Sequence, residues 1–100
     1  MKIALDWDGT FTRNPEFWTD FIKLCLKYNL DVRIVTMRSP SMNNSDISPV
    51  PEIEIIYTSN KQKREHCDEI DWHPDIWIDD SPEFIVRQDI LQFLEVMKGK

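Results

Sequence analysis

Glycine, cysteine and long apolar runs are scarce in this sequence, and each scarcity excludes a class of protein. Two glycines and six prolines among 100 residues argue against a fibrous or low-complexity chain. Two cysteines provide no disulfide framework, and the lack of a Cys-x-x-Cys pair or a Cys/His cluster excludes the common zinc sites. No stretch approaches the ~20 apolar residues of a membrane span, and the amino terminus lacks a signal-peptide pattern. We therefore expect no membrane association.

Positive charge is also in short supply, with 12 Lys and Arg against 18 Asp and Glu and a net charge of −6. This balance argues against broad binding to nucleic acids or anionic membranes, although it leaves room for a local basic site. Cys25 and Cys67 lie in helix-like segments among apolar residues, which is typical of buried free thiols in a reducing compartment. We therefore expect a cytoplasmic protein that folds as a single domain over residues 1–100.

Strand-like and helix-like segments alternate along the chain. Short segments rich in β-branched and other apolar residues predict strands at 2–6, 31–36, 53–58 and 75–79. Helix signals predict one helix from Pro15 with Asn14 as its N-cap, one at 61–70, and one after Ser81-Pro82-Glu83 with apolar residues at 85, 86, 90, 93, 94 and 97. The proline-rich residues 38–51 predict a loop with at most one helical turn. Together these segments predict an α/β fold, a single small Rossmann-like domain with a parallel sheet flanked by helices.

The first predicted helix carries an apolar stripe that we expect to face the core. Its members recur at helical spacing and are Phe17, Phe21, Leu24, Cys25 and Tyr28, with Trp18 and Ile22 broadening the stripe. Asn29 is the predicted stop of this helix. In the helix predicted at 61–70, Cys67 and Ile70 are the expected core contacts.

The first predicted strand leads into the most informative stretch, Asp6-Trp7-Asp8-Gly9-Thr10. On a regular strand, two carboxylates two residues apart point to the same face, and Gly9 indicates that the chain turns here. Carboxylates this close repel each other unless a divalent cation or a bound proton offsets their charge, and both remedies suit phosphate chemistry. A calcium-binding EF-hand is excluded, because Phe11, Thr12 and Arg13 follow where further oxygen ligands are needed.

Side chains able to do chemistry follow the end of each predicted strand. Because ligands bind α/β proteins at the carboxyl ends of parallel strands, we expect these side chains to meet at one edge of the sheet. The set comprises Asp6, Asp8, Thr36, the Lys61–Lys63 region and Asp79-Asp80. Several acids with one hydroxyl and one lysine are suited to metal-assisted phosphoryl transfer.

In these motifs the chain resembles the phosphatase branch of the haloacid dehalogenase (HAD) superfamily. Four motifs stand in the family's order: an apolar strand followed by Asp-x-Asp-Gly-Thr at 3–10, an apolar strand ending in Thr36, a lysine at 61 or 63, and an apolar strand ending in Asp79-Asp80. The resemblance covers residues 3–83. It implies a HAD-like fold and a magnesium-dependent phosphohydrolase.

The resemblance also implies a role for each matched residue. Asp6 would be the nucleophile that forms an aspartyl-phosphate, and Asp8 would be the general acid that protonates the leaving oxygen and then activates water. Mg²⁺ would bind a carboxylate oxygen of Asp6, the main-chain carbonyl of Asp8 and an acid of the fourth motif. We favour Asp80 for that last ligand, with Asp79 as a supporting or alternative ligand. Thr36 would donate a hydrogen bond to the phosphoryl oxygens.

The lysine that would offset charge on the nucleophile and the phosphate is either Lys61 or Lys63. Lys63 is favoured, because it lies one turn before Cys67 on the helix face assigned to the sheet. Two further side chains lie near these motifs. Arg38 is expected either to reach a substrate phosphate or to form a surface ion pair, and Trp7 is expected to pack in the core or beside the site.

Most members of the family carry a cap domain over the site, and no segment here is long enough for one. Residues 9–14 separate Asp8 from Pro15, and about two dozen residues separate Thr36 from the lysine. An open site implies a large substrate or a neighbouring copy in a homo-oligomer. The expected substrate is a phosphomonoester, which is a small molecule, a nucleotide or a macromolecular end. Two alternatives stay open: a phosphate- or metal-binding regulatory module with little or no turnover, and a phosphotransferase.

Overall fold

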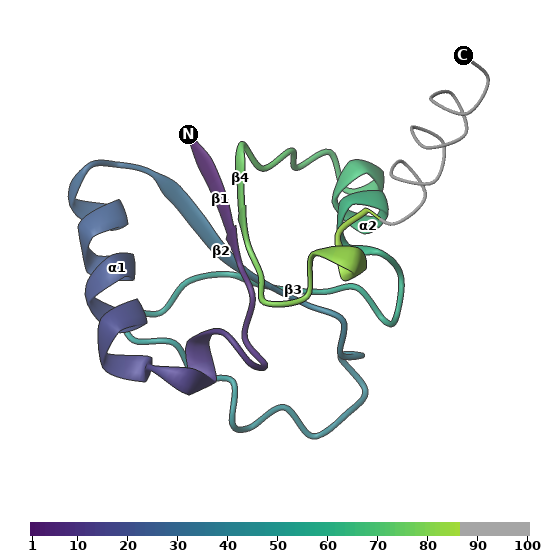
Figure 1. The fold of residues 1–100 in the computed structure, drawn as a ribbon, viewed down its shortest axis with the longest axis horizontal. Coiled ribbons are helices and arrows are strands. Elements are labelled where there is room, and N and C mark those ends of the chain that lie inside the picture. The colour runs from purple at the N-terminus through teal and green to yellow at the C-terminus, as the bar shows by residue number, and fades with distance from the viewer. Residues whose placement is uncertain (87–100) are drawn as a thin grey trace, which may run out of the picture.

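A parallel sheet of four short strands lies between two helices in the computed structural model, which describes residues 1–86 (Figure 1). The strands stand in the order β3-β2-β1-β4, and every neighbouring pair is parallel. All four predicted strands are confirmed, three of them with shorter bounds: β1 (Lys2–Leu5), β2 (Asp31–Thr36), β3 (Ile55–Tyr57) and β4 (Ile76–Ile78). The α/β class and the parallel sheet follow the sequence prediction, and the layout is consistent with a Rossmann-like arrangement.

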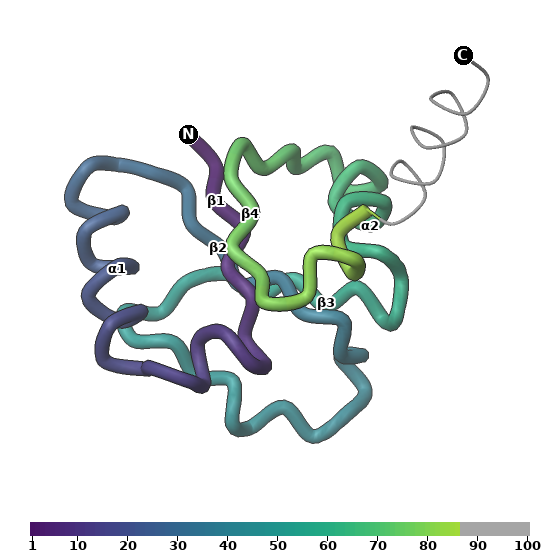
Figure 2. Tube along the Cα trace, viewed as in Figure 1, coloured from purple at the N-terminus to yellow at the C-terminus, as the bar shows by residue number. Residues whose placement is uncertain are grey.

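The two helices cover opposite faces of the sheet, as the ribbon and the Cα trace both show (Figures 1 and 2). Side chains alternate between faces along a strand, so Ile3 and Leu5 of β1 join one core cluster while Ala4 joins the other. The first cluster includes Ile22 of α1 (Pro15–Lys27). The second includes Cys67 of α2 (Lys63–Glu69). Each face is thus closed by one helix.

The boundaries of α1 match its sequence signals, and the predicted core stripe is confirmed in part. The Asn14 side chain accepts a hydrogen bond from the backbone N–H of Phe17, and Asn29 adopts a left-handed conformation (φ 58°) just beyond the helix. The predicted core stripe was wrong for Phe17, Leu24 and Tyr28, which are exposed. The other four members of the stripe do pack in the core, namely Trp18, Phe21, Ile22 and Cys25.

Helix α2 forms within the predicted 61–70 segment, and it too differs in one core contact. Cys67 is buried as expected, but Ile70 follows the end of the helix and is exposed. Trp72 fills that side of the core instead, and its indole N–H donates a 3.0 Å hydrogen bond to Asp31. This hydrogen bond satisfies the polar N–H group of Trp72, so the rest of the ring can be buried beside the sheet.

The connection between β2 and β3 runs over residues 37–54 and contains neither helix nor strand, so the single helical turn allowed by the sequence is not formed. Ile47 is buried in the α1-side core and anchors this connection to the sheet. At the other end of the described chain, a short 3₁₀ helix spans Pro82–Phe84 where a longer helix was predicted to begin. The rest of that predicted helix lies outside the described residues. Within 1–86, no helix is long and apolar enough to cross a membrane.

The strand order creates a switch point between β1 and β4. The chain passes from β1 to β2 and then β3 on one side, and afterwards crosses to β4 on the other side of β1. The register pairs Leu5 with Ile78, so that Asp6 and Asp79 leave the sheet next to each other. In open parallel sheets, the crevice at the carboxyl ends of such strands is the usual ligand site.

Candidate active site

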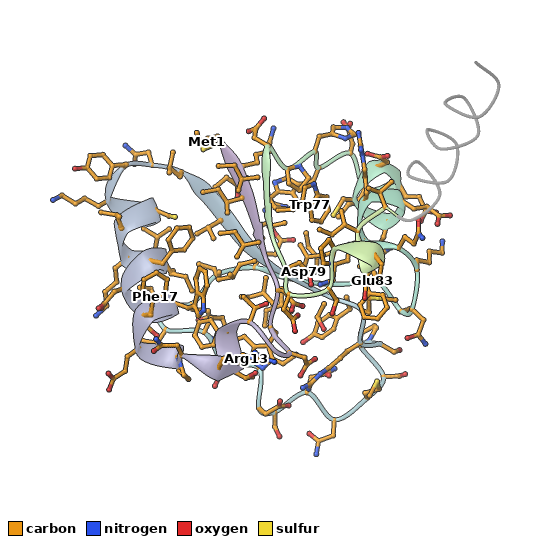
Figure 3. All side chains as sticks on the ribbon, viewed as in Figure 1. Met1, Arg13, Phe17, Trp77, Asp79 and Glu83 are labelled. Carbon is orange, nitrogen blue, oxygen red and sulfur yellow. The ribbon has the colours of Figure 1, made fainter. Side chains whose placement is uncertain are left out.

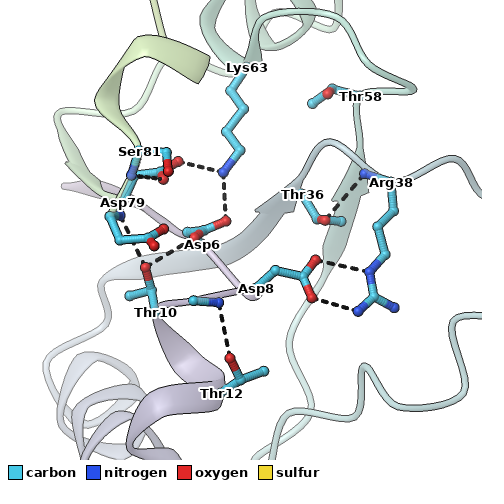
Figure 4. A network of polar contacts seen from close by, with 12 residues as sticks. Asp6, Asp8, Thr10, Thr12, Thr36, Arg38, Thr58, Lys63, Asp79 and Ser81 are labelled. Atoms are coloured by element: carbon cyan, nitrogen blue, oxygen red, sulfur yellow. Dashed lines mark hydrogen bonds and ion pairs between the residues drawn. The ribbon is translucent and has the colours of Figure 1, made fainter.

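Asp6 is the centre of a polar network at the carboxyl end of β1 (Figure 4). The residue is only 7% exposed, and its backbone N–H donates to the carbonyl of Ile78. One carboxylate oxygen accepts a 2.7 Å hydrogen bond from Nζ of Lys63, and the other accepts a 3.0 Å bond from the hydroxyl of Thr10. These contacts hold the carboxylate in one orientation.

Lys63, and not Lys61, is the lysine that reaches this network. Its side chain extends from the first turn of α2, is almost fully buried, and bridges Asp6 and Asp79 at 2.7 and 2.5 Å. Lys61 instead forms a surface ion pair with Glu69 at 2.9 Å. The preference for Lys63 therefore agrees with the observed geometry.

Burial governs the protonation of Asp6. Removal from water raises the pKa of Asp6 from 3.8 to about 6, although Lys63 partly offsets this effect and the neighbouring Asp79 adds to it. The carboxylate is therefore ionised near neutral pH and becomes protonated in mild acid. An ionised carboxylate fixed by a lysine and a hydroxyl is a group that can attack an electrophile or bind a cation.

Three carboxylates stand close enough to hold a metal ion. Oxygens of Asp6, Asp79 and Asp80 all lie within 4.8 Å of one another, and hard oxygen donors of this kind suit Mg²⁺. Both carboxylate oxygens of Asp79 are already engaged, one by Lys63 and one by the N–H of Ser81. Asp80 is exposed, and its carboxylate receives no hydrogen bond from another of the residues 1–86 in the structure. The donor set fits a divalent cation, and Asp80 is the more available acid of the fourth motif.

Gly9 allows the turn after Asp8 and leaves space for the Asp80 carboxylate. It has a positive φ of 82°, and a Cβ at this position would overlap the Asp80 carboxylate. Thr10 fastens the same junction, because its hydroxyl donates to Asp6 and accepts from the backbone N–H of Asp80 at 3.2 Å. From the sequence, Thr10 belonged to the first motif but had no assigned role. Its position directly after Gly9 was the only sequence feature that linked it to the site.

Asp8 lies at the rim and is held by Arg38. Nε and Nη2 of Arg38 donate to the two carboxylate oxygens of Asp8 at 3.0 and 2.6 Å. The same guanidinium donates two bonds to Asp46, at 2.7 and 2.8 Å. The hydrogen bonds to Asp46 and then those to Asp8 raise the pKa of Arg38. In turn, the hydrogen bonds from Arg38 lower the pKa of Asp46. Of the two roles offered for Arg38, the structure contains the ion pair. Asp46 carried no signal in the sequence.

Thr36 completes the site at the end of β2. It is buried, and its hydroxyl accepts a hydrogen bond from the backbone N–H of Arg38 at 3.3 Å. It shares with Asp6, Asp8, Lys63, Asp79 and Asp80 the lining of a pocket of about 300 Å³. All the residues singled out from the sequence as catalytic or metal-binding are therefore brought together. The pocket is also lined by residues that the sequence did not single out for the site, namely Met37, Met42, Asn60, Ser81 and Phe84.

Trp7 does not line this pocket and belongs to the α1-side core cluster instead. Its ring is buried and stacks on Phe11 with centroids 4.2 Å apart and planes 14° from parallel. The expectation that Trp7 packs in the core is confirmed. The view of all side chains shows Asp79 near the centre of the molecule, with Arg13 and Phe17 on the α1 side (Figure 3).

Comparison with known proteins found no matching family model, no similar curated protein and no similar solved structure.

Proposed function

We propose that the protein is a HAD-type, magnesium-dependent phosphohydrolase that acts on phosphomonoesters through an aspartyl-phosphate on Asp6. The observation that carries this proposal is the buried Asp6 carboxylate fixed between Lys63 and Thr10 at the switch point of the sheet. Acids that could hold a metal ion line the same pocket, as does Thr36. The order of the four sequence motifs supports the same reaction.

Each residue has a defined task in the proposed reaction. An oxygen of Asp6 attacks phosphorus, the bond to the leaving oxygen breaks, and Asp8 protonates that oxygen. Water then attacks phosphorus, Asp8 accepts its proton, and the Asp6 carboxylate is released with inorganic phosphate. Thr36 donates a hydrogen bond to the phosphoryl group, and Lys63 offsets negative charge on it.

Mg²⁺ fits the oxygen donors of this site and, when bound, supplies positive charge that offsets the phosphate charge. Asp6 and Asp80 would hold it with carboxylate oxygens, the main-chain carbonyl of Asp8 would add a ligand, and Asp79 would support them. We also propose a reducing, cytoplasmic setting, because Cys25 and Cys67 are both buried free thiols.

One contact must change during the proposed reaction. Both carboxylate oxygens of Asp8 accept hydrogen bonds from Arg38, so neither is free to serve a leaving group in this arrangement. Asp8 therefore has to exchange Arg38 for the substrate. This contact is also the specific observation that favours the second candidate, a phosphate- or metal-binding regulatory module that turns over slowly or not at all. A phosphotransferase would use the same first step and a different acceptor.

The test is phosphate release from p-nitrophenyl phosphate with magnesium, for the wild type, Asp6→Asn and Asp20→Asn. Asp20 is an exposed acid on α1 and is the matched control. We expect activity in the wild type and in Asp20→Asn, loss of at least 100-fold in Asp6→Asn, the scale on which positioned catalytic groups act, and dependence on magnesium after EDTA treatment. Near-wild-type activity of Asp6→Asn would overturn the proposal, and so would wild-type activity that persists in chelator. Magnesium-dependent phosphate binding without turnover would favour the regulatory module.

A further inference from the structure

Three apolar side chains line the pocket and are not used by the proposed chemistry. Met37, Met42 and Phe84 line the same pocket as Asp6 and Lys63, and we call these three residues the apolar wall. Met37 and Met42 belong to the connection after β2, and Phe84 ends the short 3₁₀ helix after β4. The wall thus joins two segments that are distant in sequence.

Two side chains of this wall are exposed to solvent. Met42 is 56% exposed and Phe84 is 46% exposed, although both lie beside a strongly polar site. Removal of large apolar side chains from water is favourable. Exposed apolar residues beside polar ones in a pocket are therefore typical of a ligand site. Methionine adapts its shape to a partner, and both its sulfur and a phenyl ring make favourable contacts with aromatic rings.

The charges in the pocket limit what can accompany the phosphoryl group. Asp6, Asp8, Asp79 and Asp80 all line it, and Lys63 and Arg38 are the cations that join them there. A further anionic group on the substrate would find no unpaired cation among these lining residues, because Lys63 pairs with Asp6 and Asp79 and Arg38 pairs with Asp8. It would lose its hydration without compensation. A neutral ring would instead contact the apolar wall without that cost.

We propose that the apolar wall receives the leaving group, and that the substrate is a phosphomonoester whose leaving group carries a flat, uncharged aromatic ring near the ester oxygen. This inference rests on the proposed function, because it places the phosphoryl group at Asp6. A pocket of about 300 Å³ lies at the small end of ligand sites and suits a phosphoryl group with one ring. Met42 and Phe84 are specificity-determining residues in this account.

The first test compares benzyl phosphate with ethyl phosphate, two alkyl esters whose leaving groups have similar intrinsic reactivity. We expect the wild type to favour benzyl phosphate in kcat/KM by about 10-fold or more, the usual scale for added apolar contact. Phe84→Ala and Met42→Ala should each reduce that ratio to less than about 3-fold. Phe17→Ala, an exposed phenylalanine on α1 outside the pocket, is the matched control and should retain the full ratio.

The second test measures binding, so that it does not depend on turnover. 2-Phenylethylphosphonate and propylphosphonate replace the ester oxygen by a methylene group, and their affinities are compared by titration calorimetry with magnesium present. We expect the aromatic phosphonate to bind about 10-fold more tightly to the wild type and to Phe17→Ala, and to lose most of that advantage in Phe84→Ala and Met42→Ala.

The two tests separate the inference from the proposed function. Selective binding of the aromatic phosphonate without hydrolysis of either ester would overturn the phosphohydrolase and support the apolar wall. Hydrolysis of both esters with equal kcat/KM, or a preference that survives in both wall variants, would overturn the wall and leave the phosphohydrolase intact. Equal affinity of the two phosphonates for the wild type would overturn the wall as a binding surface.

Discussion

Lys63 shows most clearly how a single residue can connect folding with the proposed chemistry. Its ammonium group is buried and lies within 2.7 Å of both Asp6 and Asp79. Two neighbouring buried carboxylates would repel each other strongly without it. A buried charge of this kind is expensive to leave unpaired, so the three groups depend on one another.

Removal of Lys63 should therefore destabilise the protein. In Lys63→Met, we expect the free energy of unfolding at pH 7 to fall by roughly 3 kcal/mol or more, because two buried carboxylates lose their counter-ion. The loss should be smaller at pH 5, where Asp6 is mostly protonated. Urea denaturation at the two pH values measures both effects.

Lys61→Met is the matched control, since it removes a lysine two positions away whose partner is the surface residue Glu69. Its stability should change little at either pH, because exposed ion pairs contribute little. Equal destabilisation by the two substitutions would contradict the structural role of Lys63.

The pKa of Asp6 makes a separate prediction about stability and pH. Its folded-state pKa of about 6 lies above its ordinary value of 3.8, so between these pH values the folded protein binds more protons than the unfolded chain. Stability from this group is present in acid and is lost as the pH rises through the window from about 4 to 6. Asp6→Asn should therefore be more stable than the wild type at pH 7 in EDTA, by roughly 1–3 kcal/mol.

That advantage should shrink toward pH 4, where the wild-type carboxylate is also neutral. Thermal or urea unfolding across pH 4 to 7 measures the difference, and a variant that is less stable than the wild type at pH 7 would contradict the raised pKa.

At the residue scale, the sequence predicted the members of the site better than their contacts. Asp6, Asp79 and Lys63 follow from motifs at strand ends, because strand ends in a parallel sheet share one edge. The pairing of Arg38 with Asp46 could not be predicted, since it depends on the path of an irregular connection.

At the scale of elements, α1 shows what periodicity determines and what it leaves open. The spacing of apolar residues and the Asn14 cap predicted the helix and its ends. The predicted apolar stripe was wider than the face that the helix buries, because apolar residues occupy much of its circumference. Contact with the sheet selects Ile22 and Cys25, whereas Phe17 and Leu24 stay exposed.

Truncation of a side chain on the buried face of α1 should therefore lower the free energy of unfolding more than truncation on its exposed face. Ile22→Ala should lower the free energy of unfolding by roughly 2–5 kcal/mol, because Ile22 is fully buried and its loss leaves a cavity. Leu24→Ala should change it by roughly 0.5 kcal/mol or less, since Leu24 is half exposed. Chemical denaturation of both variants measures the contrast, and similar losses would show that the packed face of α1 is assigned wrongly.

The connection over 37–54 is the element that sequence reasoning described least. Its prolines and polar residues predicted a loop, and the loop is observed. Its function in the fold comes from Ile47, which is buried in the core, and Asp46, which pairs with Arg38 at the pocket rim. Both contacts depend on the path of an irregular connection, which no local sequence pattern specifies.

At the scale of the whole molecule, alternating strands and helices predicted a parallel sheet, and the sheet is confirmed. The convergence of acids, lysine and threonine on one edge is also confirmed. The strand order was not predicted, because alternation alone does not say on which side of β1 the last strand pairs. That order matters, since it places Asp79 beside Asp6 at the switch point.

The central claim is that Asp6 carries the phosphoryl group, and the most direct measurement is to trap it there. Asp8→Asn retains the proposed nucleophile but lacks the base for hydrolysis, and p-nitrophenol leaves without a proton donor. We expect this variant, mixed with p-nitrophenyl phosphate and magnesium and quenched in acid, to gain one hydroxylamine-sensitive phosphoryl group. Peptide mass spectrometry should locate it on Asp6, and Asp6→Asn should gain none. Turnover of the ester by the wild type with no phosphorylated protein in Asp8→Asn, or a label on another residue, would contradict the account.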